Sequence, residues 1–175
     1  MQLLKQEVTL KGQSSYFALY EEKQKKWVLK RDYKIEGPKT FYTFLKQVPF
    51  EIDYAILQIN QPYRNLLYSF YSQLKISLAK EAVIDEFEKR IGVTRYFYEE
   101  VAASLQRAVR TEKGDWKGFI YEFYSLSNGE EALALYEKWQ LNLPLNDKYA
   151  TSFIRFMEYY LQEIVNYFEI KKSLP

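Results

Sequence analysis

The spacing of hydrophobic and polar positions changes about one third of the way along the chain. Strand-like spacing occurs in four early segments: 2–10, 15–21, 26–35 and 53–59. A short helix is predicted between the last two, because Pro38 suits a first helical turn and Pro49 ends the pattern after Gln47. Beyond Pro62 the apolar residues recur every three or four positions, which predicts about six helices.

Several helical stripes can be followed individually. The first stripe after Pro62 continues through Leu74 and Leu78, which predicts that these two residues are helical. Ser127-Asn128-Gly129 predicts a helix end, followed by a new helix that carries Trp139. The last stripe predicts one long helix over about 147–170.

These patterns predict an α+β fold. Residues 1–60 are expected to form a small antiparallel β-sheet with one helix, and residues 61–175 a mainly helical bundle. We expect the two portions to pack together as one compact unit. A chain of 175 residues can bury a core of its own without disulfide bonds.

The amino-acid composition excludes many kinds of catalytic site. The chain has no histidine and no cysteine, but it has 17 tyrosines. Catalytic triads with histidine, cysteine nucleophiles, zinc fingers and haem ligation by histidine or cysteine are therefore excluded. No glycine-rich phosphate loop is present, the first residues lack the apolar core of a signal peptide, and no stretch approaches ~20 apolar residues. We expect a soluble cytoplasmic protein without a cofactor, a catalytic residue, a metal site or a membrane partner.

Charge is distributed unevenly, although the net charge is only +2. Residues 1–60 hold ten basic and seven acidic groups, whereas residues 111–175 hold seven and ten. Alternation over 26–35 predicts one apolar strand face and one basic face. The apolar face would hold Trp27, Leu29, Tyr33 and Ile35, and the basic face Lys26, Lys30, Asp32 and Lys34, with Val28 as an exception.

This basic face predicts contact with nucleic acid. Lys23 and Lys25 would add to Lys26, Lys30 and Lys34 as phosphate ligands, with Trp27 as a stacking residue. Three strands followed by a helix loosely resemble the small arm-binding modules of some phage and transposon integrases. The alternative is a solvated face whose lysines protect a sheet edge from aggregation.

A second candidate lies in residues 81–110. Ile91-Gly92-Val93-Thr94 resembles the turn of helix-turn-helix DNA-binding proteins, where glycine permits the turn and threonine caps the next helix. That resemblance implies that Arg95, Tyr96 and Tyr98 contact nucleic acid. The alternative is two bundle helices joined by an ordinary glycine turn.

The sequence thus favours a non-catalytic binding protein whose partner is nucleic acid or a nucleoprotein complex. One alternative is a protein-interaction module or inhibitor from a phage or mobile element, which would use its tyrosine-rich or acidic C-terminal helices against a host complex. Another is a metal-dependent nuclease, because the order of the early elements resembles that of ribonuclease-H-like proteins. That resemblance implies acids on adjacent strands, for which Glu7 and either Glu51 or Asp53 are the candidates.

Overall fold

The computed structural model describes residues 1–8, 15–58, 61–90, 116–142 and 148–172. Contacts divide the chain into two units, Met1–Ala79 with Glu169–Pro175, and Lys80–Phe168. The first contains the sheet and the second is helical, which confirms the α+β fold. The sheet extends beyond residue 60, where the sequence analysis ended it. The expected packing of the two portions as one compact unit stays a prediction.

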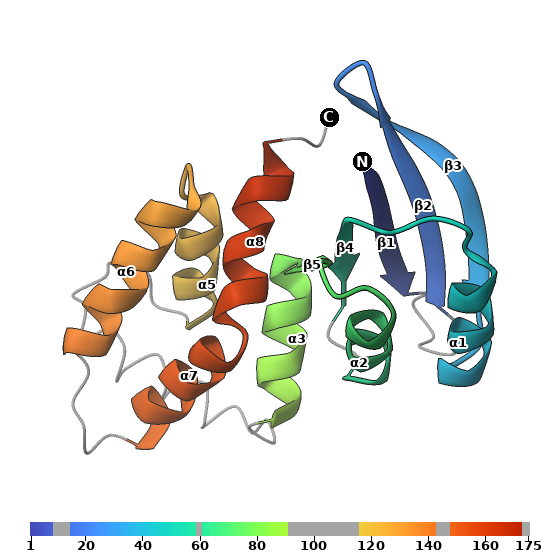
Figure 1. The fold of residues 1–175 in the computed structure, drawn as a ribbon. Coiled ribbons are helices and arrows are strands. Elements are labelled where there is room, and N and C mark those ends of the chain that lie inside the picture. Colours follow the sequence, from blue (N-terminus) through green and yellow to red (C-terminus); the bar gives the residue numbers. More distant parts are fainter. Residues whose placement is uncertain (9–14, 59–60, 91–115, 143–147, 173–175) are drawn as a thin grey trace. The chain divides into compact units, whose positions relative to one another are not determined.

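The first unit is built around a five-stranded sheet with the order β3-β2-β1-β4-β5 (Figure 1). Its strands are β1 (Gln2–Val8), β2 (Ser15–Lys23), β3 (Lys26–Ile35), β4 (Tyr54–Leu57) and β5 (Lys75–Leu78). The first three strands pair antiparallel, but β4 lies parallel to β1 and β5 parallel to β4. The sheet is therefore mixed: the predicted antiparallel pairing holds for β1, β2 and β3 but not for β4 and β5. The chain passes through a helix before each parallel strand, as parallel connections require.

Strand β5 replaces part of a predicted helix. Leu74 and Leu78 fit a helical stripe, yet the helix α2 (Gln61–Phe70) ends before them. In β5 the last three residues are all buried, so the strand has no polar alternation. A short strand with both faces covered cannot be distinguished from a buried helix by its spacing alone.

Helix α1 (Pro38–Gln47) and α2 cover one face of the sheet, called the helix face below. The helix α1 has the bounds that its two prolines predicted. Phe17 of β2 stacks on Phe41 of α1 with ring centroids 4.3 Å apart, and the edge of Tyr63 of α2 meets both rings. Aromatic residues of three elements thus form the core on this side.

The opposite face of the sheet has a smaller core. Leu3, Trp27 and Ile56 cluster there with Ile170, which lies near the end of the chain. An ion pair with 2.6 Å between Lys75 Nζ and Glu169 Oε2 lies in the same unit. The last described turn of the chain therefore completes the core of the first unit.

The described part of the second unit consists of helices around an aromatic core. They are α3 (Lys80–Arg90), α5 (Trp116–Ser125), α6 (Gly129–Asn142), α7 (Lys148–Tyr159) and the first part of α8 (Leu161–Lys171). Trp139 lies at the centre, within 6 Å of the rings of Phe119, Phe123 and Phe153. None of the described helices is long and apolar enough to cross a membrane.

Of two helix boundaries predicted from the sequence in this unit, one is confirmed and one is wrong. Asn128 caps α6 by accepting a hydrogen bond from the Glu131 N–H at 2.9 Å, so the predicted break at 127–129 is confirmed. The single long helix predicted for 147–170 is wrong, because the chain breaks at Tyr160 between α7 and α8. No proline or glycine marks that break.

Candidate nucleic-acid interface

The tip of the β2–β3 hairpin carries three of the predicted lysines. A two-residue turn joins the strands, and both of its residues have positive φ, 49° at Gln24 and 62° at Lys25. Positive φ at both turn positions is the pattern of a type I′ turn, which usually contains asparagine and glycine. Lys23 and Lys26 lie directly opposite each other beside this turn. All four side chains are exposed.

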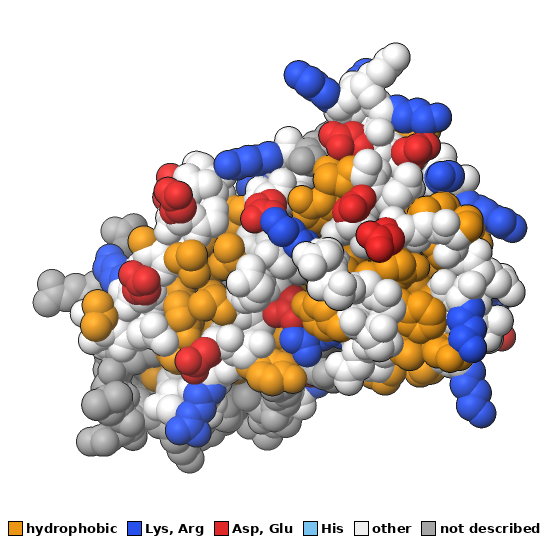
Figure 2. All heavy atoms as spheres, in the orientation of Figure 1, with side chains coloured by type: hydrophobic (Ala, Val, Ile, Leu, Met, Phe, Trp, Pro, Cys, Tyr) orange, Lys and Arg blue, Asp and Glu red, His pale blue; other side chains and the backbone are white. Residues whose placement is uncertain are grey.

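This tip projects beyond the rest of the sheet. The strand β1 begins opposite Glu21, so the residues from Glu22 to Trp27 extend past its first pair (Figure 1). Figure 2 shows Lys and Arg side chains around the end of this hairpin, with acidic side chains below them. Lys23 Nζ lies 3.6 Å from Glu21 Oε2, and both groups keep solvent contact. The tip thus carries three exposed lysines, of which Lys23 has an exposed ion pair with Glu21.

The predicted basic face does not exist, because β3 contains a bulge. Leu19 pairs with Arg31 and Tyr20 with Leu29, so Lys30 has no paired residue on β2. One extra residue reverses the alternation of side chains along a strand. Pairing with β2 accordingly places Lys26 on the helix face and Lys34 on the opposite face.

The bulge also overturns the assignment of Trp27. The sequence placed it with Ile35 on one face, as a stacking residue for bases. The structure places these two residues on opposite faces. Trp27 is only 9% exposed and packs in the cluster with Leu3, Ile56 and Ile170. It is a core residue and cannot stack on a base without leaving that cluster.

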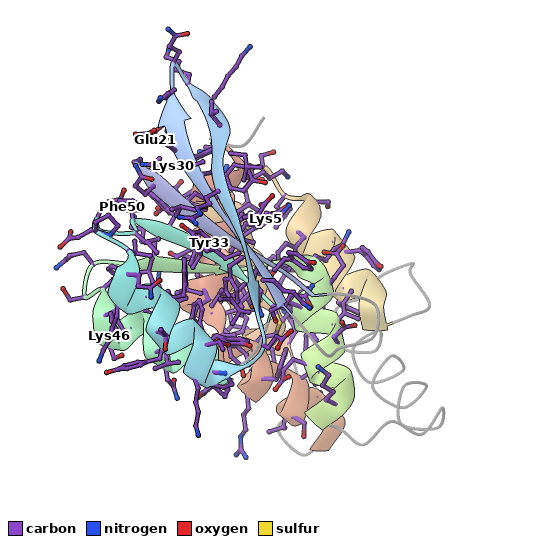
Figure 3. All side chains as sticks on the ribbon, turned by 90° about the vertical axis from the view of Figure 1, so that its right-hand side faces the viewer. Lys5, Glu21, Lys30, Tyr33, Lys46 and Phe50 are labelled. Atoms are coloured by element: carbon purple, nitrogen blue, oxygen red, sulfur yellow. The ribbon has the colours of Figure 1, made fainter. Side chains whose placement is uncertain are left out.

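The other two lysines of β3 have neighbours of their own. Lys30 Nζ lies 4.5 Å from the ring centroid of Phe50, and Figure 3 shows this pair on one side of the unit. Lys34 Nζ lies 3.1 Å from Glu36 Oε1. The hydrogen bond from Lys34 to Glu36 raises the pKa of the lysine ammonium, and the negative charge of Glu36 adds to this effect. Lys34 is therefore partly neutralised at the far end of the strand from the tip.

The remaining predicted contacts cannot be compared with the structure. Arg95, Tyr96 and Tyr98 lie outside the described residues, as does all of 91–110. Within 81–110, the structure describes only the part of α3 up to Arg90. The resemblance to a helix-turn-helix therefore stays a prediction.

Sequence reasoning missed a second group, in which one lysine lies beside three rings of α1 and of the C-terminal end of α2. Lys46 Nζ lies 4.5 Å from the ring centroid of Tyr42. The Tyr42 ring meets Phe70 edge-on at 5.4 Å, and Phe70 lies 6.2 Å from Tyr71. The contact of Lys46 with Tyr42 could have been predicted, because residues four apart on a helix are neighbours on its surface.

The carboxyl ends of β1 and β4 meet at one edge of the sheet, where a ribonuclease-H-like protein would be expected to hold its acids. Here Gln6 Oε1 accepts a hydrogen bond from the Gln58 N–H at 3.2 Å. The Gln6 amide in turn donates to Ser15 Oγ at 3.2 Å. The neutral side-chain amide of Gln6 thus meets the backbone of Gln58, the residue after β4, at this edge.

Glu7 and Asp53, two of the three acids proposed for a metal site, lie apart. Asp53 precedes β4 and accepts a hydrogen bond from the Gln2 N–H at 2.7 Å. Glu7 lies five residues farther along β1, a distance of about 16 Å in a strand. Glu7 and Asp53 therefore cannot share a metal ion. Among the described residues, no group of three or more acidic side chains could hold a metal ion.

The tyrosine-rich helices of the second unit are divided between core and surface. Tyr124, Tyr136 and Tyr160 are buried, whereas Tyr121 and Tyr159 are exposed. Glu163, expected on an acidic surface, is buried as well. Among the described residues of this unit, most aromatic side chains therefore belong to its core.

The sequence matches no known protein-family profile and no curated protein.

Proposed function

We propose that the protein binds nucleic acid without catalysis and that the β2–β3 hairpin tip is its phosphate-binding element. The observation that carries this proposal is the pairing of Lys23 with Lys26 beside Lys25. Like charges directly opposite each other destabilise a strand pair. A polyanion would convert that repulsion into favourable contact, because each ammonium can neutralise a phosphate and release a counterion.

Backbone strain at the same place supports the proposal. A side chain in the left-handed region costs about 1–2 kcal/mol relative to glycine, and the turn has two such residues. The fold itself has no need of Gln24 and Lys25 there, since Asn-Gly would form the same turn with less strain. Local choices that cost stability tend to be found where a protein interacts with something else.

The non-catalytic part of the proposal is supported by the Gln6 amide at the carboxyl ends of β1 and β4. Two-metal nucleases need carboxylates to neutralise the cations. Gln6 brings an uncharged amide to this edge, and that amide is already used in hydrogen bonds to the Gln58 N–H and to Ser15 Oγ. The purified protein should therefore leave labelled DNA and RNA intact in 5 mM Mg²⁺ or Mn²⁺. Cleavage that stops with a chelator and in Asp53→Asn would contradict this part.

The binding part is tested with a tip variant, Lys23→Gln/Lys25→Gln/Lys26→Gln. Glutamine keeps the side chains long and polar and removes only the charges. We expect fluorescence anisotropy to show weaker binding of labelled DNA and RNA by this variant. Equal affinity of variant and wild type would contradict the proposal. No nucleic-acid binding by the wild type at 50 mM salt would also contradict it, and would favour the alternative of a protein partner.

A further inference from the structure

The rings on α1 and α2 form a second surface that the hairpin tip does not explain. This surface, called the aromatic patch, consists of Tyr42, Phe70 and Tyr71, with Lys46 over the first ring. Tyr42 is 41% exposed, and the other two rings are partly exposed. All belong to the first unit, which also holds the hairpin. Large exposed rings beside cations are a common feature of surfaces that bind a charged, flat-ringed partner.

A further ring and cation, Phe50 and Lys30, belong to the same unit. Lys30 lies on β3, about 13 Å along the strand from Lys26, and its ammonium contacts Phe50. Phe50 follows the C-terminal end of α1, and Lys46 is in the last turn of that helix. Figure 3 shows Lys30, Phe50 and Lys46 on the same side of the unit. Cations and rings thus recur from the tip toward α1.

We infer that the nucleic acid is single-stranded and that an unpaired base stacks on Tyr42. This inference rests on the proposed function and adds the substrate class to it. A duplex keeps its bases stacked on each other and offers mainly phosphates, which the tip alone could bind. An unpaired base exposes its ring face, for which an exposed tyrosine is a suitable platform.

The lysine beside the ring has a defined part in this arrangement. Lys46 now lies over Tyr42, where the ring attracts its charge. A phosphate attracts the ammonium more strongly than a ring, so a bound strand would draw Lys46 toward the backbone and uncover the ring for a base. Glu51 is close enough to Tyr71 to help raise the pKa of its phenol, after the larger effect of burial. Because the Glu51 carboxylate repels phosphate, the backbone of the bound nucleic acid is expected on the Lys46 side of the patch.

Three 12-nucleotide probes separate stacking from charge. They are a labelled single strand, its duplex, and an abasic strand that keeps the phosphates but lacks the bases. Tyr42→Ala should weaken binding of the single strand by about tenfold, since stacking on one ring commonly has that size. The same variant should bind the duplex and the abasic strand as the wild type does.

Tyr68→Ala is the matched control. Tyr68 is 39% exposed, and Arg64 lies 5.4 Å from its ring centroid. It lies two residues from Phe70 on α2, so it points about 200° away around the helix. We expect this variant to bind all three probes as the wild type does.

The outcomes separate this inference from the proposed function. If the wild type binds the single strand no better than the abasic strand, or if Tyr42→Ala binds it normally, the inference is wrong. A loss of binding in the tip variant would then still support the proposed function. If the wild type binds none of the probes, both are wrong. Circular dichroism and melting of Tyr42→Ala exclude loss of the fold as the cause.

Discussion

Lys23 lies directly opposite Lys26 at the end of the β2–β3 hairpin, with Lys25 in the turn between them. The pairing concentrates three positive charges at the end of the hairpin, beyond the first residue pair of β1 and β2. It also separates them from Lys34, which is paired with Glu36 at the other end of β3. The site is thus a tip and not the continuous basic face that alternation predicted.

The strain in the turn predicts a stabilising substitution. Gln24→Gly should raise the free energy of unfolding by about 0.5–1 kcal/mol, because glycine removes the left-handed cost but loses more chain entropy on folding. Urea denaturation measures this. Gln24→Ala is the control, since alanine keeps the strain and should not stabilise. Nucleic-acid affinity should be unchanged in Gln24→Gly, as all three lysines remain.

The cluster around Trp27 predicts that the end of the chain stabilises the sheet. Ile170→Ala should lower the free energy of unfolding by about 2–5 kcal/mol, the usual range for emptying a buried position of this size. Thermal melting of the variant checks this. Leu141→Ala serves as the control, because Leu141 is 85% exposed and its loss should be nearly neutral. Similar melting temperatures for the two variants would argue against the role of Ile170.

Burial of Tyr136 predicts a loss of stability in alkali. Desolvation raises the pKa of its phenol to about 12, and the nearby charge of Glu158 adds to the shift. The folded state therefore holds this proton more tightly than the unfolded state, where the pKa is about 10. The resulting stability is complete below pH 10 and is lost as the pH rises from about 10 to 12.

The measurement for this prediction is urea denaturation at several pH values between 9 and 11.5. Over pH 10 to 12 the contribution of this phenol amounts to about 2–3 kcal/mol. Tyr136→Phe loses the hydrogen bond from Gln140, which lowers stability at every pH, but it should show a shallower decline with pH. Parallel declines in wild type and variant would show that Tyr136 is not the responsible group.

Local signals in the sequence were sufficient for some elements. Pro38 and Pro49 bracket α1, and Ser127-Asn128-Gly129 marks the break before α6, because such signals act over a few residues. The α+β class followed from the change of spacing after residue 60.

Features that depend on long-range packing could not be predicted. The bulge at Lys30 is set by how β3 pairs with β2, and it moved Trp27 from the predicted stacking site into the core. The contact of Gln6 with Gln58 joins residues that are 52 positions apart. The patch around Tyr42 depends on α1 lying beside α2, which no local pattern specifies.

The most direct test of the central claim is the salt dependence of nucleic-acid binding. Wild type and the tip variant would be compared by anisotropy with duplex DNA and with single-stranded DNA between 50 and 300 mM salt. The control is Lys89→Gln/Lys138→Gln/Lys172→Gln, which removes three exposed lysines elsewhere. We expect the slope of log K against log salt to fall by about two to three units in the tip variant and to stay unchanged in the control. Equal slopes for wild type and the tip variant would contradict the assignment of the hairpin tip as the phosphate-binding element.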